Sequence, residues 1–409
     1  MAILPGIDEI KQSLNDIVEG RTGPDSIPSD EPLLDVVQTQ RMPSDAAYMG
    51  HALQLAKRGL FTAHPNPRVG CVLVKDSHIV GEGWHQRAGE SHAEVVALKQ
   101  AGRDAAGATA YVTLEPCCHH GQTPPCTKAL VKAGIKRVVI ATEDPNPQVN
   151  EGGIFELSEA GIDTSVGIGR DQARELNRGF IKRMQYGRPW VTLKIAVSLD
   201  GKTAMADGES QWITSEASRL DAHRMRAAAS GILTGVGTVL RDNPALTARA
   251  ADVERQPLRI IVDTHLSTPA NARLLSQPGS TLILTSDEGA EDLNQTIFPS
   301  MKTVEVESVP RRNGRVDLAA MLEVLGRRQM NEIMLEAGAS LSGAMLNAGL
   351  VDEIVVYQAP DLLGSATREM FALNDLATLS DKLVWEYHQV RMVGRDCKII
   401  LRSADAPGI

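Results

Sequence analysis

Aromatic residues, cysteines, long apolar runs and basic blocks are all scarce in this sequence. Phe, Trp and Tyr make up 3% of the 409 residues, so the cores must consist mainly of Val, Ile, Leu, Ala and Met. No apolar run approaches the about 18 residues of a membrane-spanning helix, which argues against an integral membrane protein. The formal net charge is −9 and Lys and Arg are not clustered, which argues against a nucleic-acid-binding protein.

The five cysteines do not form the even, regular pattern of a disulfide framework. Cys117, Cys118 and Cys126 fall within ten residues, a clustering that in a reducing compartment favours metal binding or catalysis. The N-terminal residues are acidic and match neither a secretory signal nor an Arg-rich transit peptide. We therefore expect a cytoplasmic protein. Residues 1–43 are polar and contain several Pro, Asp and Ser, so a mobile extension is expected there.

Short apolar runs alternate with helical patterns along the remaining chain, which predicts an α/β fold. At roughly 150 residues per domain, the length suggests two or three domains. The first domain is expected over residues 44–169, followed by a polar linker helix over 170–188 and a second α/β domain over 189–409. In the first domain the expected strands are 69–74, 109–114 and 137–142, and the expected helices are 45–58, 93–102 and 126–134. In the second domain the expected strands are 190–198, 231–235, 258–263, 281–286, 332–338, 352–360, 383–392 and 397–402, and the expected helices are 215–230 and 339–349.

The strongest chemical signal is His92-Ala93-Glu94, followed by Pro116-Cys117 and then by Cys126. One imidazole and two thiolates supply three ligands to a tetrahedral zinc, which leaves the fourth position for water. Zinc can lower the pKa of that water towards 7, and Glu94 would take its proton and pass it to a leaving amine. Zinc nucleobase deaminases have this arrangement, although their common motif has two residues between the cysteines and this sequence has eight.

A closed structural zinc site, or a pair of ordinary core cysteines, is the alternative interpretation. A closed site needs a fourth protein ligand, which Cys118 or His119 can in principle supply. Glu94 distinguishes the two kinds of site, because a structural zinc has no use for a carboxylate beside it.

Glycine-containing turns mark the second domain. Gly235-Val236-Gly237-Thr238 follows one strand-like run, and Gly338-Ala339-Ser340 follows another and opens a helix. Glycine at such a turn lets backbone N–H groups approach a phosphate near the helix N-terminus. Neither turn has the GxGxxG pattern, so on its own each is more typical of a tight turn than of a phosphate site.

Several segments resemble the bifunctional family of riboflavin biosynthesis, diaminohydroxyphosphoribosylaminopyrimidine deaminase / 5-amino-6-(5-phosphoribosylamino)uracil reductase. The resemblance to the deaminase half rests on HPNPRVGCVLV, GEGWHQRAGESHAEVVAL, ATAYVTLEPCCHHGQTPPC and EDPNPQV. The resemblance to the reductase half rests on SLDGKTAMADGESQWIT, GVGTVLRDNPALTAR and LEAGASLSGAML. It covers roughly residues 44–402 and implies a cytidine-deaminase-like α/β/α domain followed by a dihydrofolate-reductase-like α/β domain. The implied cofactors are zinc and NADPH, and the implied substrate is a diaminopyrimidinone ribotide.

The resemblance also implies roles for individual residues. It assigns the zinc to His92, Cys117 and Cys126, and proton transfer to Glu94. Implied substrate positions of the deaminase are Asn66, His85, His119 and Asn146. Implied cofactor positions of the reductase are Ala196, Trp212, Thr238, Asp242, Thr264, Gly338, Ala339, Ser340, Leu341, Ser342, Gly343 and Ala344. Implied substrate positions of the reductase are Ser210, Arg226, Leu246, Arg249 and Glu336, and the two arginines can hold a phosphate in an otherwise acidic protein.

Two positions depart from the family pattern. Cys118 stands where Ser is usual, and Gln122 stands where a basic residue is usual. Gln offers a substrate phosphate only neutral hydrogen bonds, so phosphate binding by the deaminase half becomes an open question.

Two other functions remain as alternatives. The chain would be a single-activity deaminase if its second half were degenerate, but the intact SLDGK, GVGT and EAGASLSGA segments argue against this. It would be a non-catalytic module if the zinc site were closed. In each case the expected partner is a small molecule, with no nucleic acid or membrane, and a homo-oligomer would form through the second domain.

Overall fold

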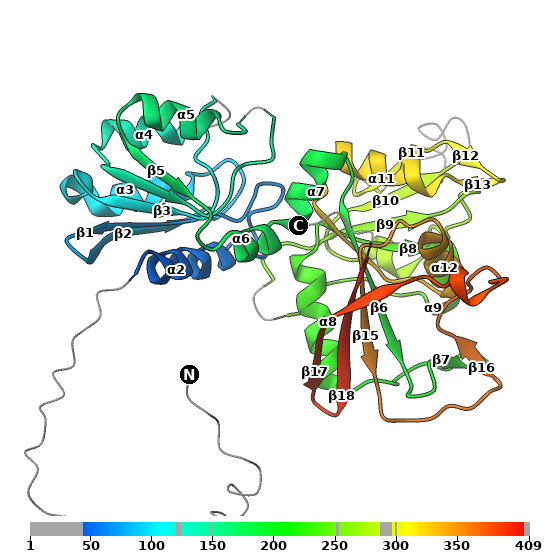
Figure 1. Ribbon diagram of the computed structural model, residues 1–409. Coiled ribbons are helices and arrows are strands. Elements are labelled where there is room, and N and C mark those ends of the chain that lie inside the picture. Colours follow the sequence, from blue (N-terminus) through cyan, green and yellow to red (C-terminus); the bar gives the residue numbers. More distant parts are fainter. Residues whose placement is uncertain are drawn as a thin grey trace, which may run out of the picture. The chain divides into compact units, whose positions relative to one another are not determined.

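The computed structural model describes residues 44–119, 124–147, 149–250, 253–286, 297–298 and 301–404. Two main β-sheets organise this part of the chain, one in each expected domain (Figure 1). The extension expected over residues 1–43 lies outside the described residues. None of the described helices is long and apolar enough to cross a membrane.

The first sheet has five strands in the order β2-β1-β3-β4-β5. β1 pairs antiparallel with β2 and β3, while β3, β4 and β5 are parallel. The elements are α2 (Asp45–Lys57), β1 (Gly70–Lys75), β2 (His78–Trp84), α3 (Ala93–Ala101), η1 (Gly102–Ala105), β3 (Thr109–Val112), α4 (Cys126–Lys132), β4 (Arg137–Ile140), α5 (Gly152–Glu159) and β5 (Asp163–Val166). The three predicted strands and three predicted helices are present, whereas β2, β5 and α5 were not predicted.

Both faces of this sheet are covered, which confirms the predicted α/β/α layering. Cys71 and Leu73 of β1 pack with α3, α4 and α5 on one face. Val72 and Val74, which point the other way along the same strand, pack with α2 on the opposite face. This burial on both faces explains why the strand forms a continuous apolar run.

The segment 170–188 forms two helices, α6 (Arg170–Leu176) and α7 (Arg178–Tyr186), where one had been predicted. They meet at Asn177, whose buried side chain pairs with the backbone of Arg68. α6 adds Ala173 to the core of the first domain. α7 is more than a polar linker, because Phe180 and Ile181 are buried.

The second sheet has nine strands in the order β11-β10-β9-β8-β14-β6-β15-β18-β17. The run from β11 to β15 is parallel, and β18 and β17 are antiparallel. The strands are β6 (Trp190–Val197), β7 (Lys202–Met205), β8 (Gly231–Gly235), β9 (Leu258–Val262), β10 (Thr281–Thr285), β11 (Val304–Ser308), β12 (Arg311–Arg312), β13 (Arg315–Val316), β14 (Glu332–Leu335), β15 (Glu353–Gln358), β16 (Thr367–Glu369), β17 (Trp385–Val393) and β18 (Asp396–Ser403). The helices are α8 (Glu216–Ala228), α9 (Val236–Asp242), η2 (Arg273–Ser276), α11 (Leu318–Arg327), α12 (Ala339–Asn347) and η3 (Leu379–Asp381).

All eight predicted strands and both predicted helices of this domain are present. β7, β11, β12, β13, β16, α9 and α11 were not predicted. Because the central strands are parallel, their carboxyl ends meet at one edge of the sheet, where ligands of such sheets bind. Gly235, Thr264 and Glu336 all lie at or just beyond these ends.

Candidate active sites

The N-terminus of α3 carries the first group of candidate residues. His92 is the N-cap residue, and Glu94 lies in the first turn with 3% of its surface exposed. α3 lies very close to β2, since a Cβ on Gly83 would come within 2.2 Å of the Ala93 carbonyl oxygen. A glycine is therefore required at this point of β2, and the close approach fixes the position of the helix end.

His92, Cys117 and Cys126 come together as predicted, and they form the one cluster of potential metal ligands among the described residues. Nδ1 of His92 lies 3.2 Å from Sγ of Cys126 and 3.5 Å from Sγ of Cys117. A tetrahedral zinc with Zn–N of about 2.0–2.1 Å and Zn–S of about 2.3 Å would hold such N and S atoms roughly 3.5 Å apart. The donor types and their spacing therefore fit zinc.

The electrostatics of this cluster suit a metal site with an acid–base group beside it. Hydrogen bonds from Cys126 and His92 lower the pKa of the Cys117 thiol to about 4, so it is a thiolate at neutral pH. Burial, reinforced by the Cys117 charge, raises the pKa of Glu94 to about 6. Glu94 is not part of the ligand cluster, which agrees with a carboxylate that moves protons instead of binding the metal.

Asn66 and His85 lie next to this cluster. The His85 ring packs edge-on against the His92 ring, with 5.4 Å between centroids. Asn66 Nδ2 donates to His85 Nε2 at 3.0 Å, which places the His85 proton on Nδ1, facing the carbonyl oxygen of Ser91. Two of the four predicted pocket residues are thus in contact with each other, and one of them, His85, is in contact with His92.

Four other positions near the ligand cluster were singled out from the sequence, namely Cys118, His119, Asn146 and Gln122. Sγ of Cys118 faces the Val149 carbonyl oxygen at 4.0 Å, and neither Cys118 nor His119 belongs to the ligand cluster. Nδ1 of His119 is buried without a hydrogen-bond partner in the described structure. The backbone of Asn146 donates to Asp144 at 2.9 Å. Gln122 lies outside the described residues.

Glu115 was not singled out from the sequence, yet it supports the zinc site from directly before Pro116 and Cys117. It is buried, and its carboxylate accepts four backbone N–H hydrogen bonds at 2.9–3.2 Å. The donors are Asp144, Glu151, Gly153 and Ile154. Two of them lie in the first turn of α5, whose own N-cap side chain makes no bond, so Glu115 caps this helix from the loop that follows β3. Glu115 could have been found from the sequence, because it is an acidic residue at the end of an apolar run and next to a predicted metal ligand.

In the second domain, Arg226 and Glu336 form a buried ion pair. Nε and NH2 of Arg226 donate to the two carboxylate oxygens at 2.5 and 2.8 Å, and NH1 donates to the Thr247 carbonyl oxygen at 3.0 Å. Burial opposes the charge on Glu336, but Arg226 more than compensates and lowers the pKa of Glu336 to about 2. All three terminal nitrogens of Arg226 thus have protein partners, and Glu336 stays ionised.

The two glycine turns also come together. The backbone N–H of Gly338 donates to Oγ1 of Thr238 at 3.3 Å, which joins the start of α12 to α9. In the predicted stretch 338–344, Gly338 and Ser340 are exposed while Ser342 and Gly343 are buried. The start of α12, at Gly338 and Ser340, is therefore the exposed part of this stretch, and Gly343 permits close packing on the Ala372 backbone.

The remaining predicted reductase positions differ in exposure. Ser210, Asp242 and Arg249 are exposed, as is Trp212, which stacks on Arg219. Arg249 also contacts the His223 ring at 3.0 Å. Ala196 lies near the carboxyl end of β6, Thr264 follows β9 and Leu246 is buried.

Lys194 is a second residue that the sequence analysis missed. It interrupts the apolar strand β6, and its ammonium lies 5.9 Å from the Tyr357 ring centroid. Burial lowers the pKa of Lys194, while the Glu336 charge raises it in part. A lysine in the middle of a buried strand was the signal that pointed to it.

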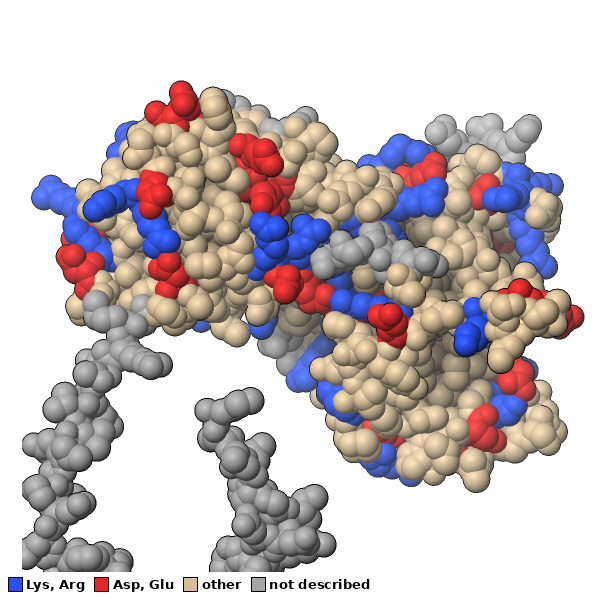
Figure 2. All heavy atoms as spheres, viewed as in Figure 1, with Lys and Arg blue, Asp and Glu red and all other residues tan. Residues whose placement is uncertain are grey.

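Charged side chains on the face shown in Figure 2 are mixed in sign, with Lys and Arg close to Asp and Glu. The visible surface therefore lacks the continuous basic stripe that nucleic-acid binding requires.

Comparison with known proteins covers both domains. Residues 42–142 match the cytidine and deoxycytidylate deaminase zinc-binding region, and residues 189–399 match the RibD C-terminal domain. The riboflavin biosynthesis protein RibD of Escherichia coli is 49% identical over 372 residues, which span 88% of this chain and all of that protein. RibD of Haemophilus influenzae is 44% identical, covering 87% of this chain and 96% of that protein.

Solved structures agree with the sequence matches. Acinetobacter baumannii RibD has a TM-score of 0.80 at 41% identity, covering 89% of this chain and 99% of that one. The deaminase/reductase of Thermotoga maritima has a TM-score of 0.78 at 32% identity, covering 88% and 99%. Matches over both domains favour a bifunctional enzyme over a single-activity deaminase or a non-catalytic zinc module. The chain therefore belongs to the RibD family of riboflavin biosynthesis proteins, in which a zinc-dependent deaminase is joined to an NADPH-dependent reductase.

Proposed function

We propose that this chain deaminates 2,5-diamino-6-ribosylamino-4(3H)-pyrimidinone 5′-phosphate and then reduces the ribosyl group of the product to ribityl. The observation that carries the proposal is the cluster of His92, Cys117 and Cys126, with the buried Glu94 beside it. Zinc, when bound, supplies Lewis acidity that makes a water nucleophilic at neutral pH, and NADPH supplies a hydride.

In the first domain, the chain's own residues would bind the base and move protons. His92, Cys117 and Cys126 hold the metal. The Glu94 carboxylate takes a proton from the attacking water and delivers it to the amine, which leaves as ammonia when the carbon–nitrogen bond breaks. A pKa of about 6 lets Glu94 alternate between the two protonation states near neutral pH. The substrate side chains proposed around it are Asn66, His85, His119 and Asn146.

In the second domain, the chain's own residues would bind and orient the substrate and the cofactor. The hydride goes to the ribosyl carbon, the ring carbon–oxygen bond opens and the oxygen takes up a proton. The first turn of α12, with Thr238, is proposed to hold the cofactor phosphates. The cofactor positions are Ala196, Trp212, Thr238, Asp242, Thr264 and residues 338–344; the substrate positions are Ser210, Arg226, Leu246, Arg249 and Glu336. Among these, we assign Arg226 to orienting Glu336, and Arg249, which is exposed, to the substrate phosphate.

We also propose the domain boundaries 44–169, 170–188 and 189–409, and a cytoplasmic location, which free thiols at the metal cluster support.

A homo-oligomer through the second domain is supported by β17, an edge strand that exposes Tyr387 (75%), Val390 (56%) and Met392 (63%). Tyr387→Glu should then lower the mass measured by sedimentation. An unchanged mass would contradict this surface.

The test of the function is to supply the diaminopyrimidinone ribotide with and without NADPH and to identify products by mass. Without NADPH, ammonia and the deaminated ribosyl compound should form, and with NADPH the ribityl compound should follow. Reduction without prior deamination would contradict the proposed order. The absence of ammonia from zinc-loaded protein would contradict the deaminase assignment.

A further inference from the structure

The loop of residues 64–68 carries Asn66 into the proposed deaminase pocket. Among the described residues, Asn66 bonds to His85 through its side chain and to the Ala63 carbonyl oxygen through its backbone N–H, at 2.9 Å. The position of this side chain therefore depends on what holds the loop on either side of it.

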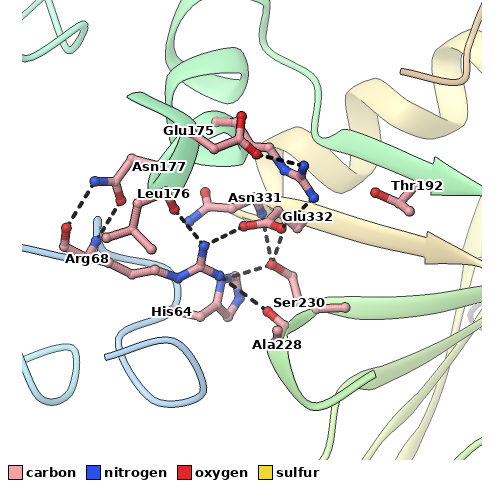
Figure 3. A network of polar contacts seen from close by, with 12 residues as sticks. His64, Arg68, Glu175, Leu176, Asn177, Thr192, Ala228, Ser230, Asn331 and Glu332 are labelled. Atoms are coloured by element: carbon pink, nitrogen blue, oxygen red, sulfur yellow. Dashed lines mark hydrogen bonds and ion pairs between the residues drawn. The ribbon is translucent and has the colours of Figure 1, made fainter. Parts of the chain in front are cut away.

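Figure 3 shows the contacts that hold His64 and Arg68 at the two ends of the loop, from residues of the second domain and from Leu176 and Asn177 of the segment 170–188. The loop is therefore held on both sides of Asn66. Before it, the Pro65 carbonyl oxygen accepts a hydrogen bond from Asn331 Nδ2 at 2.9 Å. After it, NH1 of Arg68 donates to Glu332 at 2.7 Å, and NH2 reaches the Ala228 carbonyl oxygen at 3.4 Å. Asn331 is buried, and the side chains of Arg68 and Glu332 are only 13% and 16% exposed, so these bonds are shielded from water.

A third contact fixes the start of the loop. Oγ of Ser230 lies 3.0 Å from Nδ1 of His64 and accepts the backbone N–H groups of Asn331 and Glu332 at 3.0 and 3.1 Å. Its hydroxyl is therefore the donor to His64. Burial and nearby arginines lower the pKa of His64 to about 3, so the imidazole is neutral and can accept.

These groups surround a small polar cavity that Asn66 also lines. Ser230 directly precedes β8, and Glu332 begins β14. The amino ends of two central strands of the second sheet thus contact the deaminase loop, while their carboxyl ends carry Gly235 and Glu336.

We propose that Asn331 and Glu332 are positioning residues for deamination, which hold the 64–68 loop so that Asn66 meets the base. The inference rests on the proposed deaminase function and on Asn66 lining its substrate pocket. It makes the reductase domain a structural part of the deaminase site, although it supplies no catalytic residue to it.

Asn331→Asp in the full-length chain is the sharpest test. The variant keeps an acceptor for Arg183, which donates to Oδ1, but replaces the donor to Pro65 with an acceptor. We expect the KM for deamination to rise roughly three- to tenfold, the size of one lost hydrogen bond. The kcat, the zinc content and the reduction of supplied deaminated intermediate should not change, because Glu94, the ligands and the carboxyl ends of the strands are untouched.

Glu332→Gln should give a smaller rise, because Gln still accepts from Arg68 but carries no charge. The matched control is Glu305→Gln on β11. It removes the carboxylate from an ion pair between Glu305 and Arg328, which lies outside the loop contacts. It should leave deamination unchanged. An equal effect in the control would contradict a specific role of the loop contacts.

A double-mutant cycle separates positioning from general loss of stability. If Asn331 acts through Asn66, then Asn66→Ala and Asn331→Asp together should raise the KM no further than Asn66→Ala alone. Amide hydrogen exchange in residues 64–68 should also accelerate in Asn331→Asp. Additive KM effects, or unchanged exchange, would overturn the inference. The absence of deamination by the wild-type protein would instead overturn the proposed function. In that case the amide hydrogen exchange of residues 64–68 would still decide whether Asn331 holds the loop.

Discussion

Each candidate site contains one buried glutamate, and the two glutamates have opposite electrostatic environments. Burial and the nearby Cys117 charge raise the pKa of Glu94 to about 6, and the His92 charge offsets this only in part. Glu336 is paired with Arg226, which overcomes the effect of burial and lowers its pKa to about 2. The first can exchange a proton near neutral pH and the second cannot.

The difference indicates how the work is divided between protein and cofactor. In the first domain, the ligands and the acid–base group come from residues 92–126, and the side chains themselves carry out the proton transfers. In the second, the proposed groups come from strand ends, helices and loops spread over residues 196–344, and permanent charges orient a substrate for a hydride that NADPH supplies. Substitutions of the ligands and of Glu94 should therefore lower kcat, whereas those in the second site should mainly raise KM.

The largest effect should follow from Cys126→Ser. A serine hydroxyl does not replace a thiolate on zinc, so zinc affinity should fall by more than roughly 100-fold, beyond the loss seen for outer partners of a ligand. Metal analysis after dialysis should show little zinc, and ammonia release should stop. Cys118→Ser is the control and should retain both. Retention of zinc by Cys126→Ser, with loss in Cys118→Ser, would mean that the wrong thiol had been chosen.

Glu94→Gln should have the next largest effect, and on one activity only. The amide cannot accept or deliver the proton, so ammonia release should fall by about 10²–10⁴-fold while the zinc content stays the same. Reduction of supplied deaminated intermediate should continue at the wild-type rate. Loss of both activities in folded, zinc-loaded protein would contradict separate chemistry in the two sites, and loss of neither would contradict the deaminase assignment.

Differences in burial also explain which strands and helices could be predicted from the sequence alone. β1 and β6 are covered on both faces, so they form apolar runs that are easily recognised. β2 begins with exposed residues, and β5 lies at the sheet edge with no buried residue, so neither has such a run. α5 starts at Gly152-Gly153 and is capped by a carboxylate from the loop after β3, which no local pattern encodes.

The site residues also differ in how far the sequence alone could predict them. His92, Glu94 and the cysteines are recognisable because the chemistry of zinc requires those residue types at short spacing. Glu115 and Asn331 act through backbone groups, and Glu332 through the Arg68 side chain, all far away in the sequence, so only the folded chain brings these partners together. The split of segment 170–188 has the same cause, since Asn177 pairs with Arg68.

The smallest of these effects should come from Arg249→Ala, which tests binding in the second site. Arg249 is exposed, and one of its guanidinium nitrogens contacts His223 at 3.0 Å, whereas all three guanidinium nitrogens of Arg226 are engaged with Glu336 and Thr247. A charge-assisted bond to a substrate phosphate is worth about 1.5–3 kcal/mol, so the KM for reduction should rise roughly ten- to hundredfold with little change in kcat. Steady-state rates with the deaminated intermediate and saturating NADPH give both constants.

Arg224→Ala provides the matched control, because it removes an exposed arginine from the same helix as Arg226 and should leave both constants unchanged. Deamination should be unaffected in both variants, since neither residue contacts the first domain's ligands or Glu94. The rise in KM should also shrink at high salt, where the wild type itself loses the phosphate attraction. A fall in kcat with an unchanged KM would show that the second site, like the first, uses its charges during the chemical step, and the contrast between the two glutamates would no longer separate binding from catalysis.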